Sequence, residues 1–187
     1  MVTKPVTPQQ PHHQLTRWHW LVLVAVLVLA LAPRVTGLDV FLTADEDDQI
    51  RFASGFLRSV LAQDWAGAVL LGYPGVPTMA FSAVGLGARY LLHARGVAPL
   101  PGDPAGLDAA LADVLQYPLT YIPPARTVMA TVAALGVVLI YLLLRGLVGV
   151  RIAVVTAVLV AFDPMFLANS RVLHVDAPLT YFMFLSF

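Results

Sequence analysis

A charge-free apolar run over residues 127–144 constrains the fold of this chain more than any other feature. About 20 helical residues cross the roughly 30 Å hydrocarbon core of a bilayer, so this run predicts a membrane-spanning helix. Hydrophobic residues make up 59% of the sequence, charged residues only 12%, and the mean hydropathy is +0.80. Such values are typical of membrane proteins. We therefore expect an all-α membrane protein.

Other apolar segments predict three further membrane helices, at residues 18–38, 152–168 and 177–187. Trp18 and Trp20 open the first of these, and tryptophan is common at the membrane interface. The last segment is too short to cross a bilayer. We therefore expect residues 17–187 to be the N-terminal part of a longer membrane domain.

Residues 1–16 form a polar, proline-containing tail, which we expect to be disordered. The apolar run after this tail ends in Ala30-Leu31-Ala32, a small-x-small pattern that also fits a cleaved signal peptide. Pro33 directly follows that pattern and disfavours cleavage. The sequence therefore favours an uncleaved first membrane helix.

Basic residues predict the orientation of the helices, because short cytoplasmic loops accumulate arginine and lysine. Lys4 and Arg17 precede the first helix, and Arg145 and Arg151 flank the short connection between the second and third helices. The N-terminus and this connection should therefore be cytoplasmic, and residues 39–125 should form an external loop. We expect a multi-pass protein of the plasma membrane.

The apolar segment 76–92 leaves an ambiguity in this topology. If it crossed the membrane, Arg145 and Arg151 would face outward, and residues 171–176 would lie on the face opposite Asp45. The positive-inside tendency therefore favours a helix that lies in the membrane interface.

Four consecutive acidic residues, 45–48, follow the first membrane helix. Thr43, with Glu46 three residues later, has the form of a capping box, and carboxylates suit the N-terminus of a helix. Apolar residues recur at helical spacing over residues 50–61, which predicts an amphipathic surface helix. A catalytic role for a carboxylate would use the same residues, and the two interpretations are compatible.

Ionisable residues also gather where the third membrane helix ends and the fourth begins. Arg171, His174 and Asp176 are functional candidates because they lie at a membrane boundary, although snorkelling or helix capping would also explain such residues. The predicted topology places Arg126 on the same face. Upstream, the prolines and glycines of residues 72–78 predict a turn before a helix, with Pro77 suited to its first turn.

The order of these groups resembles bacterial members of glycosyltransferase family 39, from about Trp18 to the last residue. The groups are Thr43-Ala44-Asp45-Glu46, residues 73–79, Pro124-Ala125-Arg126, Asp163-Pro164 and residues 170–176. This family is related to the dolichyl-phosphate-mannose protein mannosyltransferases and to the aminoarabinose transferases that modify lipid A. The resemblance implies a C-type glycosyltransferase fold, a helical membrane bundle whose first external loop carries two interface helices.

The resemblance also implies transfer of a sugar from a polyprenyl-phosphate carrier to an acceptor outside the cytoplasm. The presumed catalytic base of the family maps onto Asp45, with Glu46 beside it. A positioned carboxylate can take the proton of an acceptor hydroxyl. Arg126 and Arg171 are candidates for the donor phosphate, because arginine binds phosphate in a bidentate geometry.

Three further residues are predicted to bind substrate or to orient the site: Tyr73, His174 and Asp176. Many relatives have histidine where this chain has Tyr73. Some relatives bind a divalent metal ion near the loop, and Glu46 with Asp48 could contribute ligands. No histidine-rich or cysteine-rich spacing supports such a site, so the metal stays unassigned.

Composition excludes several classes of function. The chain has no cysteine, which excludes disulfides, thiolate metal sites and thiol nucleophiles. Its 11 basic and 11 acidic residues leave no net charge, so no nucleic-acid footprint is present. The expected partners are a polyprenyl-phosphate-linked sugar donor, membrane lipid, and a glycan, lipid or protein acceptor.

Two other interpretations remain open. The chain could be a noncatalytic fragment or assembly subunit of such an enzyme. It could also be a transporter component, in which charges within the membrane would line a path. The charges gather at one membrane face and the span interiors are nearly free of them, which disfavours a transporter.

Overall fold

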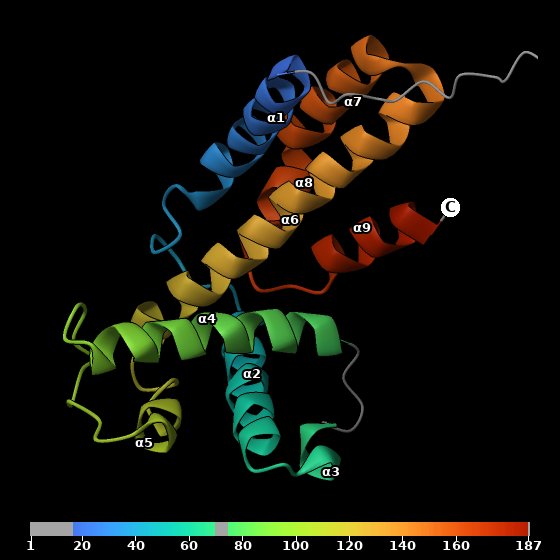
Figure 1. Ribbon diagram of the computed structural model, residues 1–187. Coiled ribbons are helices and arrows are strands. Elements are labelled where there is room, and N and C mark those ends of the chain that lie inside the picture. The colour runs from blue at the N-terminus through green and yellow to red at the C-terminus, as the bar shows by residue number, and fades with distance from the viewer. Residues whose placement is uncertain (1–16, 70–74, 187) are drawn as a thin grey trace, which may run out of the picture.

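The computed structural model describes residues 17–69 and 75–186, and the regular elements within these ranges are all helices (Figure 1). The prediction of an all-α protein is therefore confirmed. The predicted tail 1–16 and the predicted site residue Tyr73 lie outside the described residues.

Three apolar helices lie side by side and form one end of the molecule (Figure 1). They are α1 (Arg17–Val35), α6 (Pro118–Val148) and α7 (Val150–Phe162). In the described ranges, α1 and α6 are the two helices that are long and apolar enough to cross a membrane, while α7 is a shorter apolar helix. These helices correspond to the first three membrane segments expected from the sequence.

Helix α6 extends well beyond the predicted span 127–144 at its N-terminal end. It begins at Pro118 and continues through Pro123 and Pro124. The predicted span began at residue 127 because the charge-free run begins there. Proline lacks a backbone N–H and usually interrupts a helix, yet α6 continues through both. The helix therefore reaches from the apolar bundle into the region that carries the candidate site.

The predicted third span, 152–168, is divided into two helices. Helix α7 ends at Phe162, and α8 (Pro164–Asn169) begins after Asp163. Pro164 has no N–H to continue the first helix. The side chain of Asp163 caps the second one, accepting a hydrogen bond from the backbone N–H of Phe166 at 2.9 Å.

Arg34 is completely buried among these apolar helices. Its Nη1 atom donates to the carbonyl oxygens of Ala30 at 2.7 Å and Ala161 at 2.9 Å. Ala161 lies at the end of α7, where the break at Pro164 leaves carbonyl groups without helical partners. Arg34 therefore joins the ends of α1 and α7, which accounts for a charge in an otherwise apolar bundle.

Helix α4 (Val76–Ala94) runs across the lower end of α6 rather than along the apolar helices (Figure 1). The two helices approach closely at Gly85, where an added Cβ would lie 2.5 Å from the Cα of Ala125. Only a glycine permits this approach. The orientation agrees with the expected interface helix, and its position relative to a membrane stays a prediction.

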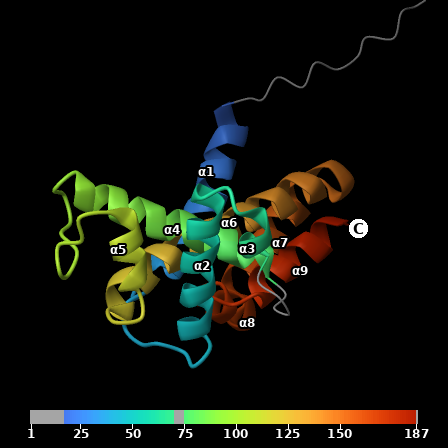
Figure 2. The same cartoon turned by 90° about the horizontal axis from the view of Figure 1, so that it is seen from below.

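Three helices lie on the side of α4 that is away from the apolar bundle. They are α2 (Glu46–Leu61), α3 (Trp65–Ala68) and α5 (Leu107–Ala112), and they lie in front of α4 in the view from below (Figure 2). Ile50 and Ala53 of α2 are fully buried in a core shared with α4, α5 and α6. The predicted amphipathic helix is thus present over these residues.

The last helix, α9 (Asp176–Ser186), packs on α6 through Tyr181. Gly136 of α6 makes room for this ring, since an added Cβ would lie 2.6 Å from Tyr181 Cδ1. The rings of Tyr181 and Phe166 also contact each other, with centroids 5.9 Å apart. Helix α9 is thereby held against both α6 and α8, with Asp176 at its N-terminus.

Candidate active site

The carboxylate of Glu46, the first residue of α2, is completely buried at the centre of the candidate site. Its Oε1 atom accepts hydrogen bonds from Arg126 Nε at 2.7 Å and from the backbone N–H of Leu173 at 2.9 Å. Its Oε2 atom accepts from Arg126 Nη2 at 2.5 Å and from the N–H and hydroxyl of Thr43, both at 2.9 Å. One carboxylate therefore connects three segments of the chain.

The predicted capping box forms only in part. Glu46 accepts from the backbone N–H of Thr43, as in a capping box, but α2 begins at Glu46 with Asp45 as its N-cap. The hydroxyl of Thr43 donates to Glu46 instead of accepting from it, and the Glu46 N–H bonds to the Thr43 carbonyl oxygen at 3.2 Å. The pair closes the turn before α2.

Arg126 is buried in α6 and makes further contacts with the segment that precedes α2. It donates to the carbonyl oxygens of Leu38 and Phe41, and its guanidinium lies 5.5 Å from the centroid of the Phe41 ring. Arg126, predicted to bind the donor phosphate, thus has its charge directly against Glu46. This contact also attaches residues 38–46 to α6.

Two opposing effects act on the pKa of Glu46. Burial raises the pKa, but the hydrogen bonds from Arg126, Leu173 and Thr43, together with the charge of Arg126, outweigh burial and hold it below the ordinary value. Glu46 is therefore ionised at neutral pH. A carboxylate with a lowered pKa is a weaker proton acceptor, so these contacts suit a structural anion better than a base.

Asp45 differs from Glu46 because its side chain is 69% exposed and makes no hydrogen bond to the start of α2. His174 is near it, with Nε2 3.9 Å from Asp45 Oδ2. On the other side of the imidazole, Nδ1 lies 3.2 Å from Asp176 Oδ2. The structure therefore brings together three residues that the sequence predicted for the site.

The two arginines predicted to bind phosphate line one pocket of about 130 Å³. Arg171 also donates through Nη2 to the carbonyl oxygen of Thr36. In the described part of the chain, Arg171 pairs with no carboxylate, whereas Arg126 pairs with Glu46. The other residues of this pocket are Gly37, Phe41, Ala168 and Val172.

The end of the predicted turn 72–78 contacts the segment that carries the ionisable residues. Gly75 has a positive φ of 143°, and an added Cβ there would lie 2.7 Å from Val175 Cγ1. Helix α4 starts directly afterwards, with Pro77 in its first turn as predicted. Tyr73 lies outside the described residues.

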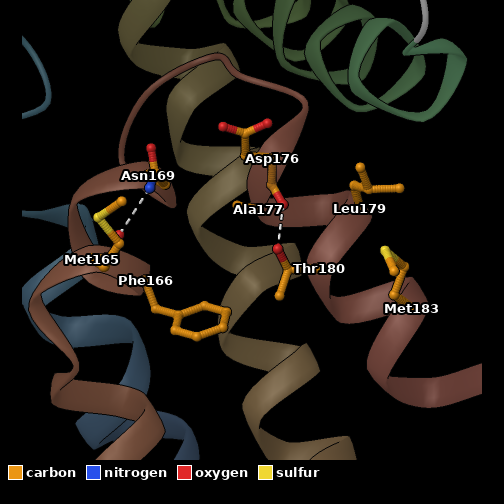
Figure 3. A pocket seen from close by; sticks show the side chains of 8 residues that line it. All are labelled: Met165, Phe166, Asn169, Asp176, Ala177, Leu179, Thr180 and Met183. Carbon is orange, nitrogen blue, oxygen red and sulfur yellow. Dashed lines mark hydrogen bonds between the residues drawn. The ribbon is translucent and has the colours of Figure 1, made fainter. Parts of the chain in front are cut away.

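A pocket of about 280 Å³ lies between α8 and α9, with Asp176 at its edge. Figure 3 shows the Asp176 carboxylate at one end of this pocket and the Phe166 ring at the other. The amide of Asn169 and the hydroxyl of Thr180 bond to backbone carbonyl oxygens of their own helices. Most of the lining is apolar, from Met165, Phe166, Ala177, Leu179 and Met183.

A family model described as dolichyl-phosphate-mannose-protein mannosyltransferase matches residues 122–187. The predicted family resemblance is confirmed. The match includes Arg126, Arg171, His174 and Asp176, and it begins after Asp45 and Glu46. This mannosyltransferase family is one of membrane glycosyltransferases, which agrees with the apolar helices of the chain. Comparisons with curated proteins and with solved structures gave no match.

The candidate site does not fit a metal centre built on Glu46 and Asp48. Both Glu46 oxygens are occupied by hydrogen bonds, and Asp48 forms an exposed ion pair with Arg51 at 2.6 Å. Within residues 17–69 and 75–186, no group of three or more histidine and acidic side chains is arranged to hold a metal ion. We assign no metal ligands.

The sequence interpretation missed one contact of the candidate site and one of the apolar bundle. The Leu173 N–H is a backbone group, and no sequence pattern indicates its bond to Glu46. Arg34 could have been recognised, because an arginine inside an apolar run must find a partner within the protein.

Proposed function

We propose that this chain supplies the base and part of the donor site of an integral-membrane glycosyltransferase. The enzyme would transfer a sugar from a polyprenyl-phosphate carrier to a glycan, lipid or protein acceptor outside the cytoplasm. The observation that supports this most strongly is the arrangement around Glu46. Its contacts with Arg126 and Leu173 hold the exposed Asp45 carboxylate close to His174, beside the arginine-lined pocket.

Asp45 is the proposed base. The acceptor hydroxyl oxygen attacks the anomeric carbon, its proton passes to Asp45, and the bond between that carbon and the phosphate oxygen breaks with its electron pair leaving on the phosphate. Exposure of Asp45 allows an acceptor to approach, and no hydrogen bond to α2 competes for its carboxylate. A positioned carboxylate of this kind typically contributes about 100-fold or more to the rate.

Arg171 is the proposed principal contact for the phosphate. The leaving phosphate gains negative charge, which a guanidinium stabilises through paired hydrogen bonds. Arg126 lines the same pocket, but its charge is balanced by Glu46. We therefore propose that Glu46 and Arg126 act chiefly by holding Asp45 and the pocket in place.

The proposed orientation follows the basic residues. The N-terminus and the connection between α6 and α7 would be cytoplasmic, and residues 39–125 external, in the plasma membrane. The candidate site would then lie at the external membrane surface, where a lipid-linked donor would place its phosphate. Membrane lipid would contact the exposed apolar residues of α1 and α7, such as Val24, Val28, Val155 and Leu159.

The test is Asp45→Asn in the full chain, expressed in membranes and supplied with radiolabelled polyprenyl-phosphate mannose. We expect wild-type protein to move label out of the lipid fraction and Asp45→Asn to lower that rate by about 100-fold or more at unchanged expression. Asp47→Asn is the matched control, since it removes an exposed carboxylate from the same turn and should keep near wild-type activity. Wild-type activity in Asp45→Asn would contradict the assignment of the base.

A further inference from the structure

His174 lies between two carboxylates that are far apart in the sequence, those of Asp45 and Asp176. Its Nε2 atom is 3.9 Å from Asp45 Oδ2, at the N-terminus of α2. Its Nδ1 atom is 3.2 Å from Asp176 Oδ2, at the N-terminus of α9. The imidazole is 31% exposed, against 69% for Asp45 and 58% for Asp176. It is the most enclosed member of the group.

This arrangement depends on the Glu46 carboxylate. Glu46 follows Asp45 in the chain, and Leu173, whose N–H bonds to Glu46, precedes His174. The single hydrogen bond between them therefore fixes how the two neighbouring side chains approach each other. Leu173 is itself completely buried, so this part of the loop is firmly attached to the core.

The two nitrogens of His174 have different surroundings. Nδ1 has the Asp176 carboxylate at 3.2 Å and the Asp176 backbone N–H at 3.4 Å. We assign the proton of the neutral ring to Nδ1, because a carboxylate is the closer and stronger partner. Nε2 then presents a lone pair toward Asp45. In such an arrangement one carboxylate fixes the tautomer and stabilises the imidazolium that forms.

We propose that His174 is a positioning residue for Asp45 and also the group that takes the proton away from it, with Asp176 holding the imidazole. This inference rests on the proposed function, in which Asp45 is the base. After transfer, the proton taken from the acceptor hydroxyl moves from the Asp45 carboxyl to Nε2, giving an imidazolium and restoring the Asp45 carboxylate. The imidazolium then releases the proton to water.

The distance between Asp45 and His174 is longer than a hydrogen bond. Hydrogen bonds of catalytic groups are often long without substrate and shorten in the reacting complex. Two carboxylates, Asp45 and Asp176, face the imidazole. Glu46 is directed away to Arg126, and Arg171 donates to Thr36, so neither of them competes for the ring.

The experiment compares His174→Ala, His174→Gln and Asp176→Asn in the full chain, with radiolabelled polyprenyl-phosphate mannose as donor. We expect each variant to lower kcat by about 100-fold with little change in KM, and to change the pH profile of kcat. Added imidazole should restore activity to His174→Ala, in proportion to its concentration, and should not restore Asp45→Asn. The double variant His174→Ala/Asp176→Asn should be no slower than His174→Ala, because the two residues act as one unit.

Thermal unfolding of each variant shows whether the protein is folded, and His174→Gln keeps the size of the side chain if His174→Ala is unstable. A wild-type rate and pH profile in folded His174 variants, together with an inactive Asp45→Asn, would overturn this inference alone. A loss of kcat that imidazole does not restore would also overturn the proton role. An active Asp45→Asn would overturn the proposed function and this inference with it.

Discussion

Glu46 and Arg126 form a buried ion pair, with Arg126 Nη2 2.5 Å from Glu46 Oε2, although 80 positions separate them in the chain. Neither side chain has more than 2% of its surface exposed. The pair joins the start of α2 to the N-terminal third of α6, and the Leu173 N–H adds the segment before α9. The geometry of Asp45 and His174 therefore depends on one carboxylate that itself faces away from solvent.

Replacing Glu46 by Gln should strongly destabilise the fold. The substitution leaves the Arg126 charge buried without a counter-charge, and breaking a buried pair in this way costs about 3–5 kcal/mol. Thermal unfolding of the purified protein in detergent measures the effect. Asp48→Asn is the matched control, because Asp48 and Arg51 form an exposed pair whose loss costs about 0–1 kcal/mol. Equal unfolding temperatures for the two variants would contradict the structure.

Acid should remove the stability that Glu46 contributes. Because the pKa of Glu46 is lower in the folded state than its ordinary value of 4.5, this contribution is complete at pH above 4.5. It is lost as the pH falls through the lowered pKa of the folded state. Unfolding temperatures measured from pH 7 to pH 3 should therefore fall more steeply for wild type than for Glu46→Gln. Parallel curves would show that Glu46 has no shifted pKa.

Gly85→Ala should separate α4 from α6. The new Cβ would lie 2.5 Å from the Cα of Ala125 and 2.7 Å from its N atom, and backbone atoms cannot move aside as a side chain can. Overpacking of this kind costs about 1–3 kcal/mol. Gly87→Ala, in the same helix, has nothing within 4 Å and should be neutral or gain up to about 1 kcal/mol from helix propensity. A difference in unfolding temperature between the two variants tests the crossing.

Labelling of single cysteines can test the predicted orientation, because the chain has no native cysteine. Ala105→Cys lies in the predicted external loop and Gly146→Cys near the end of α6, and both positions are exposed. A membrane-impermeant maleimide added to intact cells should label Ala105→Cys but not Gly146→Cys. Permeabilised cells should give labelling of both. Labelling of Gly146→Cys in intact cells would place the connection between α6 and α7 outside and contradict the predicted orientation.

Most of the helices could be predicted because their signals are local. The lengths of the apolar runs predicted α1, α6 and α7, and the spacing of residues such as Ile50 and Ala53 predicted α2. The start of α6 at Pro118 was not predicted, because local propensity opposes a helix through Pro123 and Pro124. Local sequence disfavours this part of α6, but α4 packs against it at Ala125. This packing is a tertiary contact that no local pattern contains.

The sequence could predict which residues belong to the candidate site. It could not predict which of their side chains contact one another. Topology placed Asp45, His174 and Asp176 on one face, and in the structure the carboxylates of Asp45 and Asp176 each lie within 4 Å of the His174 ring nitrogens. Glu46 and Arg126 were predicted as a catalytic residue and a phosphate ligand. Their direct pairing depends on how α2 meets α6, and no local pattern contains that information.

The Tyr181 ring over Gly136 links the apolar bundle to the candidate site. Tyr181 determines how closely α9 packs on α6, and Asp176 is the first residue of α9. A methyl group at position 136 would lift the helix and carry the Asp176 carboxylate with it, away from His174. A substitution among apolar residues can therefore change the distance between Asp176 and His174, so screens for inactive variants should include buried apolar positions as well as charged ones.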